Sequence, residues 1–483
     1  MNITDPIREF ARTAPGADAI ILPDDTAISY RALDQHIDRF ARRVLTLGLR
    51  PGQIAGLAIA PPNEALALIM ALALARIGVA SADMALPARH LAAAFVQPGI
   101  APPPGTRAIP FDRSWFAAVP GEEQEELVEG REGAAVFRVF ATSGTTGLRR
   151  FCPVSHADMA LRIAGKGFPI VSASGRTILI CAMGLGGSAG LRGCLTTFSV
   201  AGTLVFTHMA GLVNAVLRHG VTALAASPRT LQEVLATTPA GVGPLPSLRA
   251  LRISGSHLPA KLARIAAQRL CPNVVTTFGS TETSNVCSGR WGEFPSEPLA
   301  IGRILPDMEV QAVDEDHQPL PPGTEGLLRI RGPGMVKGYF DDAAATRASF
   351  RDGWFYTGDR GAVTAARVMI VTGRTGDFIN SGGVKVNPRV IEEVLLSVPE
   401  VTQAVAFAVP DADGLAQIWA AIVSETPVER AVLIRLCAEK LGPTAPKFIM
   451  QMPDLPRNEN GKIVTDALVD FAARHYQRSG AAR

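Results

Sequence analysis

Apolar and polar positions follow two different patterns along the chain. Between about residues 18 and 315, short apolar runs are followed by amphipathic stretches with helical periodicity. The expected strands are residues 54–60, 177–183, 223–226, 248–253 and 274–277, and the expected helices are residues 64–77, 212–219, 229–236 and 260–269. Repetition of strand and helix at this spacing predicts an α/β fold of parallel sheets flanked by helices.

The second pattern begins near residue 306. Met308–Val313 and Gly326–Arg331 are short alternating runs separated by Pro/Gly turns, which predicts a β-rich subdomain at about residues 306–372. A stretch bearing Gly and Asn follows, and then a compact tail of helix and strand pattern. We therefore expect a large N-terminal domain of residues 1–375 and a small α+β C-terminal domain of residues 376–483.

Composition narrows the class of protein. The chain has 483 residues, too many for one core, and with 47% hydrophobic and 19% charged residues it can bury extensive apolar surface. The formal net charge of +3 gives no reason to expect a nucleic acid or a membrane surface as partner. The six cysteines are scattered without a CxxC pair, so neither a zinc site nor a disulfide framework is indicated, and a reducing compartment fits best.

Neither a secretory leader nor a membrane span is expected. The first residues, MNITDPIREF, lack a basic region followed by an apolar one. The richest apolar stretch, residues 54–79, is interrupted by Pro61-Pro62-Asn63 and by Arg76. The run between them is shorter than the ~20 residues that span a bilayer. We expect a cytoplasmic protein, either a monomer or a homodimer.

The segment Thr142-Ser143-Gly144-Thr145-Thr146-Gly147 follows the apolar run 135–141 and concentrates hydroxyls and glycines. Glycines let backbone N–H groups approach an oxyanion closely, and the hydroxyls add donors. The segment is not a Walker A loop, because GxxxxGK[ST] does not occur in the chain. The segment therefore predicts a phosphate-binding loop, with a flexible turn as the alternative.

With its neighbours up to Arg150, this segment resembles the phosphate-binding signature of the adenylate-forming superfamily, which includes acyl-CoA synthetases, peptide-synthetase adenylation domains and firefly-type luciferases. Further motifs of that family have counterparts in the same order: 278–282 (FGSTE), 356–359 (YTGD), 373–377 (GRTGD) and 456–462 (PRNENGK), with weaker similarity at 29–33 and 334–339. The resemblance covers about residues 18–465. It implies that ATP and Mg²⁺ activate a carboxylic acid as an acyl-AMP, whose acyl group then passes to a thiol.

The resemblance also implies roles for single side chains. Glu282 would hold Mg²⁺, with a solvated surface carboxylate as the alternative. Phe278 would stack on adenine where the family more often has Tyr, and it could otherwise be a core aromatic. Asp359 would accept both ribose hydroxyls or be only a turn residue. Arg374 would contact ribose or phosphate, or form a structural salt bridge.

Lys462 is the residue most directly implied in catalysis. Its ammonium would stabilise the negative charge that develops on the α-phosphate oxygens, although most lysines in polar loops are simply solvated. The remaining nucleotide contacts implied by the motifs are Gly279, Thr281, Gly255 and Ser256. The last two belong to a loose match, Ser254–His257, to an adenine-binding loop, in which His257 could be an ordinary polar residue.

Three positions depart from the family pattern. Arg150, with Leu148 and Arg149 before it, ends the phosphate loop where the family has Pro and then Lys, so it keeps the cation while the loop loses rigidity. Gly187 stands where the family often has His, which leaves the acyl pocket open or filled from elsewhere. Gly376 stands at the hinge of the mobile C-terminal domain, where Asp or Lys is usual.

The sequence restricts the class of acid that the enzyme could activate. Peptide-synthetase domains usually carry an Asp in the segment equivalent to 184–190, and its absence disfavours an α-amino acid. The pocket residues Leu185, Gly187 and Thr277 and their small apolar neighbours fit an uncharged fatty or aryl chain. Arg192 is expected to be solvated, with pairing to a second carboxylate as the alternative.

Asn380–Gly383 resembles the loop lining the pantetheine tunnel of CoA ligases. Gly382 and Gly383 would admit the thiol arm, which favours coenzyme A as acceptor and leaves an acyl carrier protein as the alternative. The expected activity is therefore an acid:CoA ligase.

Two other classes of protein are alternatives. Residues 184–189 match GxGxxG/A after an expected strand, which suggests a dinucleotide-binding dehydrogenase. The acidic ribose ligand expected ~20 residues later is absent, because residues 171–232 contain no Asp or Glu. A nucleotide-binding pseudoenzyme is suggested by the altered loop end and the missing His, and opposed by Glu282, Asp359 and Lys462.

Overall fold

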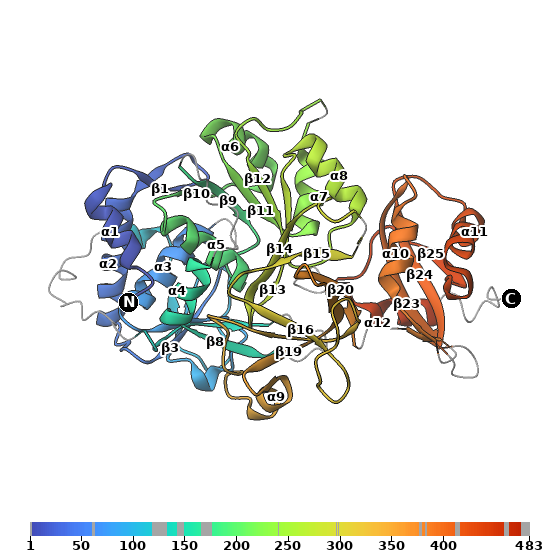
Figure 1. Cartoon of the computed structure of the whole chain (residues 1–483). Helices are drawn as coiled ribbons and strands as arrows, with labels where there is room; N and C mark the ends of the chain where they lie inside the picture. Colours follow the sequence, from blue (N-terminus) through green and yellow to red (C-terminus); the bar gives the residue numbers. More distant parts are fainter. Residues whose placement is uncertain are drawn as a thin grey trace.

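The structure is a computed structural model of the chain (Figure 1). It describes residues 2–59, 63–117, 133–142, 149–165, 176–239, 241–295, 297, 299–375, 379–381, 384–410, 416–457 and 463–474. The α-helices are α1 (Asp5–Thr13), α2 (Tyr30–Thr46), α3 (Glu64–Arg76), α4 (His156–Ala164), α5 (Ser188–Phe198), α6 (Leu212–His219), α7 (Pro228–Thr237), α8 (Ala260–Arg269), α9 (Ala343–Ser349), α10 (Pro388–Leu396), α11 (Arg430–Leu441) and α12 (Thr465–Ala472). The predicted α/β fold is confirmed.

The largest sheet has a parallel half. Its strands run in the order β2-β1-β10-β9-β11-β12-β13, parallel except for the edge strand β2. They are β1 (Asp18–Ile21), β2 (Ala27–Ser29), β9 (Ile178–Ala182), β10 (Thr203–Val205), β11 (Ala223–Ala226), β12 (Ala250–Ile253) and β13 (Val274–Ser280). The short apolar runs of the sequence form these strands because helices cover both of their faces.

The same sheet continues beyond β13 as an antiparallel half in the order β14-β15-β20-β19-β17-β16, with β18 paired to β19. Its strands are β14 (Ser284–Arg290), β15 (Ala300–Ile304), β16 (Glu309–Val313), β17 (Gly326–Arg331), β18 (Phe350–Arg351), β19 (Trp354–Val363) and β20 (Val368–Arg374). The β-rich segment seen in the sequence therefore adds strands to the large sheet.

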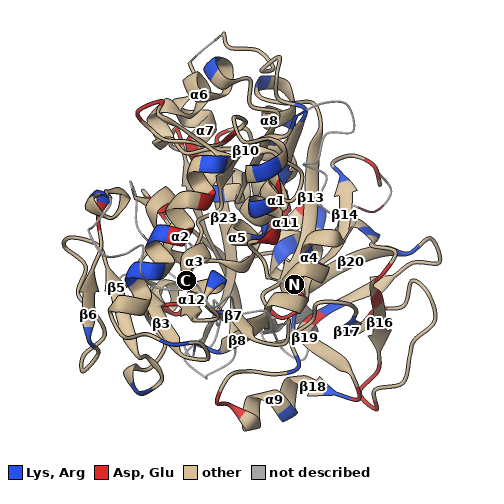
Figure 2. Cartoon of the chain, turned by 90° about the vertical axis from the view of Figure 1, so that its left-hand side faces the viewer, with Lys and Arg blue, Asp and Glu red and all other residues tan. Residues whose placement is uncertain are grey.

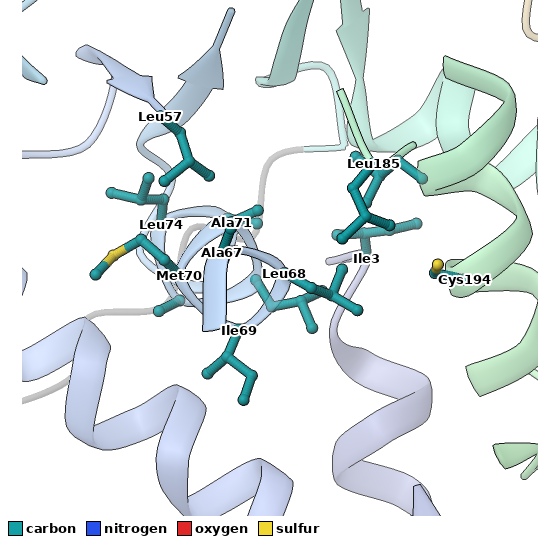
Figure 3. Packing of buried hydrophobic residues seen from close by; sticks show 14 of the residues in the cluster. Ile3, Leu57, Ala67, Leu68, Ile69, Met70, Ala71, Leu74, Leu185 and Cys194 are labelled. Atoms are coloured by element: carbon teal, nitrogen blue, oxygen red, sulfur yellow. The ribbon is translucent and has the colours of Figure 1, made fainter. Parts of the chain in front are cut away.

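A second sheet has the order β6-β5-β3-β4-β7-β8. Its strands are β3 (Ile54–Leu57), β4 (Ala80–Ala82), β5 (Ala93–Val96), β6 (Ala108–Pro110), β7 (Val136–Ala141) and β8 (Phe151–Ser155). Helix α3 is buried at every residue after Glu64, and one apolar cluster joins it to strands of both sheets and to α5. Figure 3 shows its side chains pointing outward on several sides, with Leu185 and Cys194 nearby. A helix that is apolar all round is stable only in such a core position.

The C-terminal part contains the hairpin β21 (Ile379–Ser381) and β22 (Val384–Val386) and a three-stranded sheet of β23 (Val401–Pro410), β24 (Ala416–Ser424) and β25 (Phe448–Gln451). Alternate residues of β24 face opposite sides: Ala420 belongs to the cluster under α10 and α11, and Ala421 to the cluster under α12. This part forms a separate lobe in Figure 1. The domain boundary between residues 375 and 376 stays a prediction.

The C-terminal lobe contacts the large domain through α8 and the loop before it. His257 Nε2 lies 2.6 Å from Glu393 Oε1 of α10, and Lys261 Nζ donates to the carbonyl oxygens of Pro399 and, at 3.1 Å, Val401. Elsewhere, Figure 2 shows basic and acidic residues distributed over many elements on the side that it displays. None of the described helices is long and apolar enough to span a bilayer.

Candidate active site

The order of the strands predicts a ligand-binding site at the carboxyl ends of β9 and β11. These strands are neighbours, but the chain leaves β9 for β10 on one side and β11 for β12 on the other. The connecting helices lie on opposite faces of the sheet, because α5 packs with α3 and α7 packs with α6 and α8. Ligands of open α/β sheets bind where the strand order reverses in this way. The predicted pocket loop 184–187, the loop 254–257 and the turn 280–283 follow β9, β12 and β13 at this edge.

The turn after β13 holds Glu282 rigidly. A Cβ atom at Gly279 would collide with the carbonyl oxygen of Ser284, so only glycine fits there. Thr283 N donates to Ser280 Oγ at 3.2 Å, and Ser280 N donates to Thr283 Oγ1 at 3.3 Å. Thr281 and Glu282 lie between these two residues, and Glu282 is buried. This burial disfavours the alternative in which Glu282 is a solvated surface carboxylate.

Tyr339 orients the Glu282 carboxylate. Its hydroxyl donates to Glu282 Oε1 at 2.8 Å, and Val336 N donates to the Glu282 carbonyl at 2.9 Å. Burial and the neighbouring Glu282 charge raise the pKa of Tyr339, so the phenol remains a donor at neutral pH. None of the strong sequence motifs includes Tyr339, and the weak family similarity at 334–339 is the signal that points to it.

The ends of the predicted phosphate loop are joined to each other. Thr142 N donates to the Arg150 carbonyl at 2.8 Å, and Arg150 N donates to Thr142 Oγ1 at 3.2 Å. The Arg150 guanidinium lies 5.0 Å from the centre of the Tyr339 ring, with Nη1 3.5 Å from Tyr339 Oη and 3.4 Å from Ser349 Oγ. Tyr339 therefore contacts both the predicted phosphate-binding cation and the predicted metal-binding carboxylate.

Arg162 is a further buried residue, and no sequence motif marks it. Its guanidinium donates to the Gly334 carbonyl at 2.7 Å, to Ser188 Oγ at 3.1 Å and to the Glu282 carbonyl at 3.3 Å. Burial lowers its pKa to about 10, so it stays charged at neutral pH. Arg162 thus ties α4 to the start of α5 and to the turn that carries Glu282.

Asp359 and Arg374 are opposite each other on β19 and β20. Arg374 Nε donates to Asp359 Oδ1 at 3.1 Å, and Asp359 N donates to Thr357 Oγ1 at 2.9 Å. Burial raises the pKa of the Asp359 carboxyl, and the Arg374 guanidinium acts against this rise. The structure thus contains the salt bridge that was the alternative for Arg374, while contact of either residue with a ribose stays a prediction.

The predicted adenine site consists of the loop 254–257 and Phe278. Gly255 has a φ of +100°, a left-handed conformation that favours glycine, and Ser256 is exposed. His257 belongs to the contact with Glu393 described above. The half-buried Phe278 packs against a cluster that includes Val286 and Cys287. Its stacking on adenine stays a prediction.

The predicted pocket residues have different environments. Leu185 is buried in the core cluster beside α3 (Figure 3). Gly187 is exposed at the start of α5, and a Cβ atom there would meet only the Gly184 carbonyl oxygen, at 4.0 Å. Thr277 is buried and accepts a hydrogen bond of 3.2 Å from Arg252. The expectation that Arg192 is solvated is wrong: its side chain is 2% exposed, because α5 packs inward against the sheet.

Some predicted residues lie outside the described part of the chain. They are Ser143, Gly144, Thr145, Thr146, Gly147, Gly376, Gly382, Gly383 and Lys462. Among the described residues, no group of three or more His, Cys, Asp or Glu side chains could hold a metal ion. A single carboxylate such as Glu282 nevertheless fits Mg²⁺, which usually keeps several waters and takes its other ligands from substrate phosphates.

The sequence matches two family models. The "AMP-binding enzyme" model covers residues 7–98 and 110–340, and the "AMP-binding enzyme C-terminal domain" model covers residues 390–462.

Two curated relatives differ in how much of each chain they match. The 2-succinylbenzoate–CoA ligase of Bacillus mycoides (strain KBAB4) is 32% identical over 265 residues, which is 54% of this chain and 54% of the relative. The chain thus matches about half the length of this relative. A salicylyl-CoA synthase / salicylate adenylyltransferase of a Streptomyces species is 28% identical over 96% of this chain and 92% of its own.

Solved structures share the fold at low sequence identity. The o-succinylbenzoate CoA synthetase of Bacillus subtilis, in complex with an acyl-adenylate intermediate, has a TM-score of 0.84 at 22% identity and covers 96% of this chain and 97% of its own. The anthranilate CoA ligase AuaEII, in complex with anthranoyl-AMP, has a TM-score of 0.86 at 20% identity and covers 100% of this chain and 98% of its own. At these identities the likeness establishes the architecture alone.

Proposed function

The chain belongs to the family of AMP-binding enzymes, and on this basis we propose that it is an ATP-dependent, AMP-forming acid:CoA ligase. The observation that carries the proposal is the arrangement of Arg150, Tyr339 and Glu282. The phenol of Tyr339 contacts both the Arg150 cation, at the end of the predicted phosphate loop, and the buried Glu282 carboxylate. Such a pair suits a nucleotide triphosphate and its divalent cation.

In the first half-reaction, a carboxylate oxygen of the acid attacks the α-phosphorus of ATP. The bond from that phosphorus to the bridging oxygen breaks, and pyrophosphate leaves. Arg150 and the loop 142–147 would hold the phosphates, and Lys462 would stabilise the charge that develops on the α-phosphate oxygens. Mg²⁺, held by Glu282, would neutralise part of the phosphate charge.

The nucleoside would be held by residues of three elements. Asp359 would accept the ribose hydroxyls, and Arg374 would keep this buried carboxyl ionised by opposing the effect of burial on its pKa. Phe278 would stack on the adenine, next to the loop that contains Gly255 and Ser256.

In the second half-reaction, the sulfur of coenzyme A attacks the acyl carbon, the thiol gives up its proton, and AMP leaves with the oxygen that joined it to the acyl group. Gly382 and Gly383 would line the path of the pantetheine arm. Gly376 would be the hinge about which residues 376–483 rotate between the two steps. A carrier-protein phosphopantetheine has the same terminal thiol and is the alternative acceptor.

We propose an aryl acid as substrate in preference to a fatty acid, because the relatives described above carry the names of aryl-CoA ligases or synthases. Pyrophosphate release against a panel of aryl and straight-chain acids, with and without CoA, tests the proposal. Release that requires an aryl acid, together with CoA thioester formation, supports it. Release with straight-chain acids alone contradicts the aryl preference, and nucleotide binding without release indicates a pseudoenzyme.

A further inference from the structure

Arg162 of α4 joins three segments of the chain that are far apart in sequence. It is 4% exposed. Its Nε donates to the Gly334 carbonyl at 2.7 Å, its Nη1 to Ser188 Oγ at 3.1 Å and its Nη2 to the Glu282 carbonyl at 3.3 Å. Each guanidinium nitrogen therefore has an acceptor, and the three acceptors belong to the loop after β17, the start of α5 and the turn after β13.

Two of these segments carry different halves of the predicted active site. Ser188 is buried and directly follows Gly187, a predicted residue of the acyl pocket. Glu282 belongs to the motif 278–282, whose residues are predicted to contact the nucleotide and Mg²⁺. For adenylation, the carboxylate of the acid and the α-phosphorus have to lie ~3–3.5 Å apart and in line. The relative position of the two segments therefore bears directly on the proposed reaction.

The third segment restricts the orientation of the guanidinium. Gly334 has a φ of +71°, and a Cβ atom there would lie 2.8 Å from the Asp158 carbonyl oxygen and 2.9 Å from Arg162 Cγ. The loop that contains Gly334 is therefore packed directly on α4. The same loop supplies Val336 N, which donates to the Glu282 carbonyl at 2.9 Å. One carbonyl oxygen of the metal-binding turn thus accepts hydrogen bonds both from Arg162 and from the loop that holds Arg162 in place.

Arg269, at the end of α8, is a structural arginine with which Arg162 can be compared. Its guanidinium donates to the carbonyl oxygens of Leu235, Thr238 and Pro239 at 3.3, 2.8 and 3.2 Å. All three acceptors belong to one segment, the end of α7 and the residues after it, so this arginine joins two neighbouring helices. Arg162 differs because its acceptors lie in three segments, two of which contain predicted site residues.

We propose that Arg162 is a positioning residue for adenylation, whose hydrogen bonds to Ser188 and Glu282 set the relative position of the acid and the nucleotide. The inference rests on the proposed function, because the two segments are the acid and nucleotide sites of that reaction. Arg162 acts through these segments and needs no contact with either substrate. Loss of its guanidinium should leave each substrate able to bind alone, and should impair any ligand or reaction that needs both sites aligned.

Binding of an acyl-adenylate analogue tests the role without turnover. The probes are acylsulfamoyl adenosines that carry a salicyl or an octanoyl group and occupy both sites, and AMP, which occupies the nucleotide site alone. Calorimetric titration gives the Kd of each. The wild type should bind at least one analogue about 100-fold more tightly than AMP, because the second site is engaged intramolecularly. Arg162→Met should weaken binding of that analogue by about tenfold and binding of AMP by about twofold or less, since the gain is lost when the two sites are misaligned. Arg162→Lys should recover part of the loss.

Two further variants separate positioning from general stability. Ser188→Ala removes one acceptor of Arg162 and should reduce the preference for the analogue by about threefold in the wild-type background. In the Arg162→Met background it should have no further effect, because contacting residues that act together are not additive. Arg269→Met is the matched control and should keep the full preference for the analogue.

Turnover supplies a second readout. With salicylate or octanoate as the acid, Arg162→Met should lower the kcat of pyrophosphate release by about tenfold at saturating Mg²⁺ and change the KM for ATP by about twofold or less. A rise in the KM for ATP without a fall in kcat would overturn the positioning role.

The binding and turnover results decide different claims. A ratio of analogue to AMP affinity that Arg162→Met leaves unchanged, or a wild type that binds neither analogue more tightly than AMP, overturns the positioning role and leaves the ligase activity standing. Absence of pyrophosphate release with every acid overturns the proposed function, and the ratio of affinities still decides the role of Arg162. Thermal unfolding checks each variant. If Arg162→Met does not fold, Ser188→Ala decides instead, and an unchanged ratio in that variant overturns the role.

Discussion

The Tyr339 hydroxyl donates a hydrogen bond of 2.8 Å to Glu282 Oε1, although 57 residues separate the two in sequence. The bond restricts rotation of the carboxylate. The same phenol lies beside Arg150, so one residue positions groups from both predicted phosphate-site motifs. Pre-orientation of this kind is how a metal-binding carboxylate gains affinity from residues that never touch the metal.

Tyr339→Phe should therefore weaken the use of Mg²⁺. Loss of the hydroxyl frees the Glu282 carboxylate to adopt other rotamers, and we expect the Mg²⁺ concentration for half-maximal pyrophosphate exchange to rise by about tenfold. The measurement is exchange activity against Mg²⁺ concentration at saturating ATP. An unchanged Mg²⁺ dependence would show that the bond has no role in metal binding.

Tyr30→Phe is the matched control. Tyr30 is also buried, and its hydroxyl donates to the Gly202 carbonyl at 2.7 Å, away from the predicted metal site. Its removal should cost about 1 kcal/mol of the free energy of unfolding, as for a typical buried hydrogen bond. The Mg²⁺ dependence should not change.

Arg150→Ala should raise the KM for ATP, and Arg150→Lys should recover part of the loss. The guanidinium can bind phosphate through two donors, whereas an ammonium supplies only a point charge. Steady-state kinetics with varied ATP measure both variants. If Arg150→Ala had wild-type ATP kinetics, the functional part of the loop would end at Gly147.

Gly187→Phe and Gly187→His should shift the preference toward shorter acids. A Cβ atom at this position meets no close neighbour, so a larger side chain is tolerated there, and in the predicted pocket it would leave less room for the acid. The ranking of acids by kcat/KM is the measurement. The same ranking in wild type and variants would place residue 187 outside the pocket.

Much of the fold follows from the local sequence pattern. The expected helices at 212–219 and 260–269 coincide with α6 and α8, and the strand at 223–226 with β11, because each has a clear apolar periodicity bounded by Gly or Pro. Helix α5 was not expected, since it begins among glycines and carries few charges. The membership in the adenylate-forming family inferred from ordered motifs is confirmed.

The site was predictable only where a motif marks it. Glu282 and Asp359 stand in motifs, but Tyr339 and Arg162 act through contacts with residues 57 and 120 positions away, which no local pattern encodes. For Arg192, the local sequence pattern predicts the wrong environment. An isolated arginine is normally solvated, but α5 packs against the sheet and buries this one.

Gly376→Pro should separate the two half-reactions. Proline fixes φ near −65°, which hinders the rotation proposed for residues 376–483. If that angle suits the adenylation pose, acyl-AMP and pyrophosphate should still form, while thioester formation from isolated acyl-AMP falls by a much larger factor. Equal losses in both steps, or none in either, would show that Gly376 is not the hinge.

The products of ATP turnover test the proposed reaction most directly. The decisive measurement follows AMP, pyrophosphate and acyl-CoA with an activated acid, ATP, Mg²⁺ and CoA, for the wild type and for Lys462→Ala. The wild type should form all three in equal amounts, and Lys462→Ala should stay folded and bind ATP while adenylation falls by ~10²-fold or more. Formation of ADP in place of AMP, or wild-type pyrophosphate exchange in Lys462→Ala, would contradict the account.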